Sequence, residues 1–108
     1  GVHWPYGMRR GARKWRARFD LQTVSAHSPR ELRSAETFPV DGILLSTVFA
    51  SRSASAGRAM GSLKCRLLVS KTGKMVYALG GITPDNAGVI AMTAGFAAVD
   101  GMRAFEKA

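Results

Sequence analysis

Two adjacent glycines after a short apolar run are the first candidates for chemistry in this sequence. Gly80 and Gly81 follow Met75–Leu79 directly, and the segment 83–85 (Thr-Pro-Asp) is typical of a helix start. Glycines at a strand end let the backbone approach an anion closely, and the N–H groups of a helix N-terminus can donate hydrogen bonds to it. The pattern predicts phosphate binding, while a tight strand-to-helix turn without a ligand would need the same glycines.

Ser25 and His27 form a second candidate pair, at the end of the β-rich run Leu21–Ser25. A histidine gains and loses a proton near neutral pH, so at a strand end it can act as a general acid or base. The alternative interpretation is that His27 caps the following helix. The segment 28–31 (Ser-Pro-Arg-Glu) matches the start of that helix, with an N-cap serine, a proline at the first helical position and a glutamate that completes a capping box.

The elements that must position these residues are short β-rich runs that alternate with helical segments. We predict strands at Leu21–Ser25, Ile43–Ser46, Met75–Leu79 and Phe96–Val99, with Gly1–His3 as the end of a further strand. Leu63, Leu67 and Leu68 recur at helical spacing, and Gly95 is expected to end the last helix. This alternation predicts parallel βαβ units with the helices packed outside the sheet.

The predicted fold class is α/β, a parallel (β/α) barrel of TIM type present as a half-barrel of roughly its last four to five strands. The doubly wound sheet, the other fold built from such units, carries a GxGxxG fingerprint that this sequence lacks. A barrel needs roughly 200 residues or more, and residues 1–108 form a single domain of about half that size. Two strand edges would remain open, so we expect a homo-oligomer.

The net charge of +9 is unevenly distributed along the chain. Six cations crowd one short stretch: Arg9, Arg10, Arg13, Lys14, Arg16 and Arg18. We expect this stretch to be the solvent-facing surface of an outer helix, because no zinc-ligand, helix-turn-helix or RNA-binding motif accompanies it. Nucleic acid is therefore the least favoured class of partner.

The single cysteine and the hydropathy pattern indicate where the protein works. Cys65 has apolar neighbours, which predicts a buried thiol and fits a reducing compartment. No apolar window is long enough for a membrane span, and no secretory leader opens the chain. The expected location is the cytoplasm, without a membrane partner.

Four segments, in order, resemble the superfamily of thiamine-phosphate synthases and TenI-type thiazole tautomerases. They are 1–5 (Gly-Val-His-Trp-Pro), 24–28 (Val-Ser-Ala-His-Ser), 41–49 (Asp-Gly-Ile-Leu-Leu-Ser-Thr-Val-Phe) and 78–86 (Ala-Leu-Gly-Gly-Ile-Thr-Pro-Asp-Asn). Family barrels carry similar segments at the fourth to seventh strands. The resemblance covers essentially the whole chain, and the four segments together are more specific than the glycine pair alone.

The resemblance implies a role in thiamine biosynthesis, with an active site at the C-terminal ends of the strands. A synthase of this type is a transferase that joins a pyrimidine pyrophosphate to a thiazole phosphate, with Mg²⁺ on the pyrophosphate. A TenI-type tautomerase rearranges a thiazole phosphate carboxylate without a metal. The partners implied are phosphorylated thiazole and pyrimidine small molecules, and a truncated, non-catalytic phosphate-binding protein remains as an alternative.

Two groups of side chains match functional positions of the family. Ser25 and His27 occupy its Ser-x-His position, which implies proton exchange in a tautomerase or pyrimidine positioning in a synthase. Ser51 and Ser53 match the hydroxyl residues with which synthases hold pyrophosphate, and Arg52 lies between them. The composition of this stretch is also that of a surface loop.

The phosphate cradle of the family is matched by backbone positions. Gly80 and Gly81 supply one side, and the amides of Met102 and Arg103 would complete it. Asp100, in the same turn as the second pair, would repel phosphate and departs from the pattern.

Two other departures concern the synthase reaction. The lysine that normally follows the two serines is Ala54 here, so Arg52 or Arg58 would have to replace its charge. The segment 4–9 (Trp-Pro-Tyr-Gly-Met-Arg) lacks the acidic residue that helps synthases hold Mg²⁺. We predict no metal site within this chain.

Overall fold

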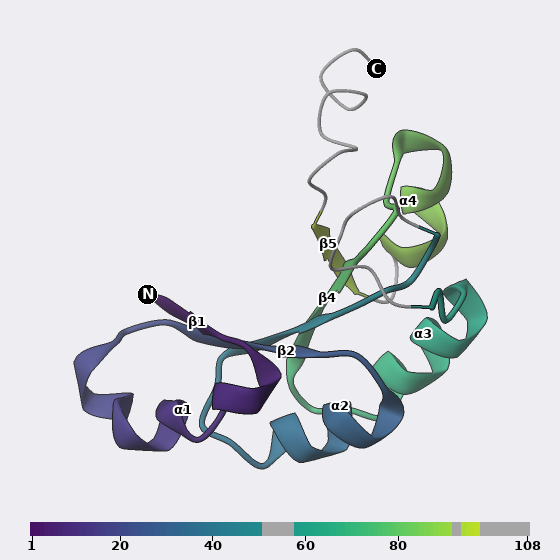
Figure 1. Ribbon diagram of the computed structural model, residues 1–108. Helices are drawn as coiled ribbons and strands as arrows, with labels where there is room; N and C mark the ends of the chain where they lie inside the picture. The colour runs from purple at the N-terminus through teal and green to yellow at the C-terminus, as the bar shows by residue number, and fades with distance from the viewer. Residues whose placement is uncertain (51–57, 92–93, 98–108) are drawn as a thin grey trace.

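The computed structural model describes residues 1–50, 58–91 and 94–97, which form one parallel sheet flanked by helices (Figure 1). The strands are β1 (Val2–Trp4), β2 (Gln22–Ala26), β3 (Gly42–Leu45), β4 (Met75–Leu79) and β5 (Gly95–Ala97). They are neighbours in chain order, and every pair is parallel. This arrangement confirms the predicted α/β fold, with the sheet as part of a barrel wall.

Helices occupy the connections between the strands. Three short pieces join β1 to β2: the 3-10 turn η1 (Tyr6–Met8), α1 (Gly11–Lys14) and the 3-10 turn η2 (Arg16–Arg18). The helices α2 (Pro29–Glu36), α3 (Ser62–Ser70) and α4 (Pro84–Ala91) follow β2, β3 and β4. Figure 1 shows the helices on the outer side of the curved sheet, as right-handed crossovers require.

The core lies between the sheet and these helices. Alternate strand residues are buried in it, and Val24, Ile43, Leu45 and Ala78 are each 0% exposed. The residues that alternate with them belong to the inner side of the sheet, which we call the open face: His3, Thr23, Ser25, Leu44, Met75 and Tyr77. Met75 and Tyr77 are 59% and 37% exposed, so no described element covers this face.

The Tyr77 ring on the open face explains two strand boundaries that differ from the predicted ones. A Cβ atom on Gly95 would lie 2.6 Å from the Tyr77 ring, and one on Gly42 would lie 3.3 Å from it. Both glycines therefore belong to strands, because the Tyr77 ring occupies the space that their side chains would fill. The expectation that Gly95 ends α4 is wrong, because the residue opens β5 and pairs with Tyr77.

The remaining boundaries lie close to the expected ones. β4 agrees in full, β2 is displaced by one residue, and β3 runs from Gly42 to Leu45 in place of Ile43–Ser46. β1 confirms the expected strand at the start of the chain. The expected strand Phe96–Val99 overlaps β5, and its last two residues lie outside the described part.

The outer helices confirm two expectations and modify a third. Cys65 is 0% exposed, and burial raises the pKa of its thiol. In α2, Ser28 Oγ accepts a hydrogen bond from the Glu31 N–H at 3.1 Å, as an N-cap should. The Glu31 carboxylate accepts its hydrogen bond from the His27 N–H at 2.6 Å and not from the Ser28 N–H of a regular capping box.

Candidate functional site

The predicted site residues lie where parallel strands end, at one edge of the sheet. His27 follows β2, Ser46 and Thr47 follow β3, and Gly80 follows β4. His27 Nδ1 and Ser46 Oγ are 2.9 Å apart and share a hydrogen bond. A Cβ atom on Gly80 would lie 2.6 Å from Thr47 Cγ2, so these strand ends are also in contact. We call His27, Ser46, Thr47, Gly80 and Gly81 the rim.

His27 is fixed in position but keeps one ring nitrogen available. Its backbone N–H donates to the carboxylate of Glu31, and Nδ1 is paired with the largely buried hydroxyl of Ser46. Among the described residues, His27 Nε2 has no hydrogen-bond partner, and the side chain is exposed. A neutral imidazole held through Nδ1 can therefore exchange a proton with a ligand through Nε2.

Ser25 does not pair with His27, which lies two residues further along the chain, directly after β2. Ser25 Oγ is 2.8 Å from Nε2 of His3, and Nδ1 of the same ring is 2.8 Å from Thr23 Oγ1. The His3 ring therefore bridges two hydroxyls across the β1–β2 pair, and partial burial lowers its pKa. His3 and Ser46 are the site residues that sequence reasoning missed.

The backbone conformation and the close packing of the turn after β4 require glycine at positions 80 and 81. Gly80 and Gly81 have φ values of 107° and 63°, a region that other residues adopt at a cost. A Cβ atom on Gly81 would collide with the Ala50 carbonyl, and the Phe49 N–H donates to the Gly80 carbonyl at 3.0 Å. The turn after β4 is therefore packed tightly against the loop after β3.

Asn86 connects this turn to the start of α4. Its side-chain oxygen accepts a hydrogen bond from the Thr83 N–H, and its side-chain nitrogen donates to the Gly81 carbonyl, each at 2.9 Å. The N–H of Thr83, just before α4, is thus satisfied by the Asn86 side chain, as in the return bond of a capping box. The glycine turn and the helix N-terminus form one rigid unit, which is the geometry that an anion-binding backbone needs.

Five predicted site residues lie outside the described part of the chain: Ser51, Arg52, Ser53, Met102 and Arg103. Asp100, the departure expected to repel phosphate, also lies outside it. Arg58 is described and exposed. The pyrophosphate loop and the second half of the phosphate cradle stay predictions.

The donor groups of the described residues do not fit Mg²⁺. Within residues 1–50, 58–91 and 94–97, no three His, Cys, Asp or Glu side chains gather closely enough to hold a metal ion. The turn after β1, where a synthase would supply a carboxylate, contains only the 3-10 turn Tyr6–Met8 and the cation Arg9. Mg²⁺ prefers carboxylate oxygens, so the described residues by themselves do not form a magnesium site. In the same residues, no helix has the length and apolar character that crossing a bilayer requires.

A cleft of about 380 Å³ lies at the opposite edge of the sheet, away from the rim. Among the residues that line it, Val69 lies near the end of α3 and Val76 in the first half of β4, and Lys74 and Ala94 directly precede β4 and β5. Ligands of (β/α) barrels bind at the C-terminal ends of the strands. The rim, and not this cleft, is therefore the candidate site.

Comparisons with known proteins identify the family and agree with the observed fold. A protein-family model described as thiamine monophosphate synthase matches residues 10–105. Among solved structures, thiamine phosphate pyrophosphorylase from Pyrococcus furiosus superposes with a TM-score of 0.67 and 24% sequence identity over 92% of this chain and 48% of its own. That likeness shows a shared fold, and the chain spans about half the length of the solved protein. No curated protein sequence matches significantly.

Proposed function

Since the chain belongs to the thiamine monophosphate synthase family, we propose that it supplies the phosphate-binding half of a thiamine-phosphate-synthase-type active site. The reaction proposed joins a pyrimidine pyrophosphate to a thiazole phosphate in thiamine biosynthesis. The observation that carries the proposal is the rim, where three consecutive strand ends contact one another. Its position at the C-terminal edge of a parallel sheet is the place where barrel enzymes bind substrate.

The glycine turn is the proposed binding site for the phosphate of the thiazole substrate. Asn86 fixes Gly81 against the first turn of α4, so the backbone N–H groups there are preorganised for an anion. The amides of Met102 and Arg103 are proposed to complete the cradle. His27 is proposed to orient the pyrimidine through Nε2, because Ser46 already holds its other ring nitrogen.

Replacing Gly81 tests the phosphate site. We expect Gly81→Ala to abolish binding of inorganic phosphate and of the thiazole phosphate, since a Cβ atom there collides with the Ala50 carbonyl and opens the turn. NMR titration of backbone amides measures the binding. Gly88→Ala is the matched control, because Gly88 lies exposed in α4, the helix that follows the turn, and a Cβ atom on it meets nothing within 4 Å.

Two outcomes of this titration would contradict the proposal. Equal affinity in Gly81→Ala and the wild type would place the cradle elsewhere. Loss of binding in both variants would indicate an effect of the added methyl group that does not depend on the turn. Far-UV circular dichroism of both variants shows whether the sheet is retained.

A TenI-type thiazole tautomerase is the second candidate, and two observations favour it. His27 has an unpartnered Nε2 among the described residues, as proton transfer requires, and the same residues offer no ligand set for Mg²⁺. One assay measures product formation from pyrimidine pyrophosphate and thiazole phosphate, with and without Mg²⁺. A second assay measures isomerisation of a thiazole phosphate carboxylate. The tautomerase would replace the synthase as the proposed function if the wild type isomerises the carboxylate but forms no condensation product. His27→Gln should then abolish the isomerisation.

A further inference from the structure

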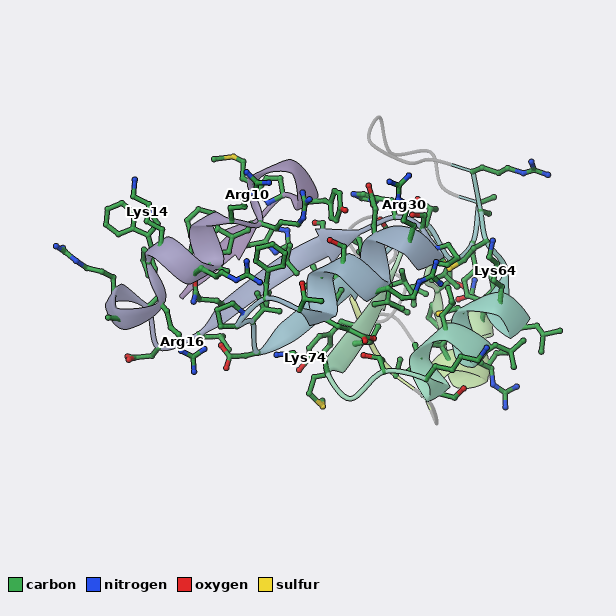
Figure 2. The ribbon with its side chains drawn as sticks, turned by 90° about the horizontal axis from the view of Figure 1, so that it is seen from below. Arg10, Lys14, Arg16, Arg30, Lys64 and Lys74 are labelled. Atoms are coloured by element: carbon green, nitrogen blue, oxygen red, sulfur yellow. The ribbon has the colours of Figure 1, made fainter. Side chains whose placement is uncertain are left out.

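The cations between residues 9 and 18 form one end of the molecule, which we call the basic end: Arg9, Arg10, Arg13, Lys14, Arg16 and Arg18. They lie on α1, on η2 and between η1 and α1, and no acidic residue precedes Asp20 in the chain. Figure 2 shows Arg10 and Lys14 on one side of this segment and Arg16 on the other, far from Lys64. The predicted outer helix is therefore three short turns that project cations in several directions.

Aromatic rings and backbone carbonyls hold several of these cations in place. The guanidinium carbon of Arg9 lies 4.1 Å from the centre of the Tyr6 ring, and that of Arg13 lies 4.3 Å from the centre of the Phe38 ring. Arg13 also donates to the Thr37 carbonyl at 3.1 Å. Such contacts restrict the side chains without neutralising their charge.

Carboxylates do not offset this charge within the described part of the chain. None of the six cations makes an ion pair there, and the main-chain carbonyls of Tyr6, Thr37 and Pro39 accept the hydrogen bonds of the arginines. Like charges at such spacing repel one another over the Debye length of about 10 Å at 0.1 M salt. A ligand with several negative charges along a flexible backbone would relieve the repulsion.

Exposed aromatic side chains interleave with the cations. Trp15 and Phe19 are 38% and 36% exposed, and Lys14 and Arg18 lie 5.6 Å and 5.8 Å from the centre of the Trp15 ring. Rings beside cations are the combination that holds a single strand, since phosphates meet the cations and bases stack on the rings. α1 has only four residues, too few for a helix that reads a duplex groove.

We propose that the basic end is a binding surface for single-stranded nucleic acid, recognised through its phosphate backbone without base specificity. The surface lies on the outer, helical side of the sheet and contains no rim residue. The proposal therefore goes beyond the thiamine-related function and does not depend on it.

Binding of a fluorescein-labelled 20-nucleotide RNA, followed by anisotropy over a salt series, tests the proposal. Six phosphate contacts predict a slope of log K against log salt of roughly −4 for a single strand. Arg10→Gln/Lys14→Gln/Arg16→Gln should reduce the slope to roughly −2 and weaken binding at least about tenfold at 0.1 M salt. The matched control is Arg30→Gln/Lys64→Gln/Arg66→Gln, which removes the same charge from exposed positions elsewhere and should retain the wild-type slope.

Three results would overturn the proposal. An equal loss of affinity in the control and in the basic-end variant would mean that net charge alone attracts the RNA. Absence of salt-dependent binding at micromolar protein would remove the interaction altogether. Tighter binding to vesicles of phosphatidylserine and phosphatidylcholine than to RNA would assign the basic end to a membrane surface. Circular dichroism confirms that each variant keeps its fold, and no measurement requires a thiazole or pyrimidine ligand.

Discussion

His3 shows how one side chain on the open face can connect two strands. Its ring nitrogens are paired with hydroxyls of Thr23 and Ser25, and both pairs span the β1–β2 ladder. A doubly paired neutral imidazole accepts a hydrogen bond from one hydroxyl and donates one to the other. Protonation makes both ring nitrogens donors, so the first hydroxyl would have to turn and accept. The ring thus fixes the Ser25 hydroxyl, which is the group that the family resemblance places near the pyrimidine.

The lowered pKa of His3 predicts a pH dependence of stability. Because its folded-state pKa lies below the ordinary value of about 6.5, the unfolded chain binds the proton more readily. The stabilisation is present above about pH 6.5 and is lost as the pH falls from that value to the folded-state pKa. Urea unfolding at pH 7.5 and 5.5 should show this loss in the wild type and a smaller one in His3→Gln. A decrease of the same size in both proteins would assign the effect to other groups.

At the scale of single residues, chain position alone could not identify the partners at the site. The alternation of β2 indicates that Ser25 and His27 share a face, but it says nothing of what stands opposite them. Their partners are His3 in β1 and Ser46 directly after β3, and only the register of three strands brings them together. A search for polar residues at matching positions of neighbouring strands would have found both.

At the scale of elements, periodicity predicted the order and type of the strands and helices, and side-chain packing determined their ends. Apolar runs indicated β4 in full, whereas the predicted strands left out Gly42 and Gly95. Both lie in strands because the Tyr77 ring occupies the space of their missing side chains. Leucine spacing predicted α3, yet Leu63 and Leu67 are 69% and 55% exposed and Cys65 occupies the buried position.

Substitution of Gly95 tests this explanation of β5. A methyl group 2.6 Å from the Tyr77 ring must displace the ring or the strand, so Gly95→Ala should lower the free energy of unfolding by about 1–3 kcal/mol. Gly88→Ala in α4 should raise it by about 0.5–1 kcal/mol, since alanine suits a helix interior better. Urea denaturation measures both changes.

A double variant identifies the cause of the Gly95 effect. Once Tyr77→Ala has removed the ring, the additional alanine at Gly95 should cost far less than it does in the wild type. If the losses of unfolding free energy caused by the two substitutions add in full, the Tyr77 ring is not the group that Gly95 accommodates.

At the scale of the whole molecule, an uncharged sheet contrasts with a cationic exterior. The net charge is +9, yet none of the five strands contains Asp, Glu, Lys or Arg. Within the described sheet, β1 and β5 each have a single neighbour. An uncharged face beside unpaired strand edges is a surface on which another chain can pair.

We expect the 108-residue chain on its own to self-associate, with the open face and the strand edges inside a two-fold assembly and the basic end outside. Burying the cations against their own copies would add like-charge repulsion, so the uncharged face is the preferred contact. Sedimentation velocity at micromolar concentration should show a dimer. A single monomeric boundary would mean that the edges are covered within one chain.

The match between strand order and chain order has a consequence for how the protein is made. Each strand from β2 to β5 pairs with the strand that precedes it in the chain, and one helical connection separates the two. Translation releases roughly 5–20 residues per second, which is slow compared with the formation of a helix or the closure of a short loop. Every new strand therefore leaves the ribosome with its neighbour already in place, and the sheet can grow in the direction of translation without waiting for the C-terminus.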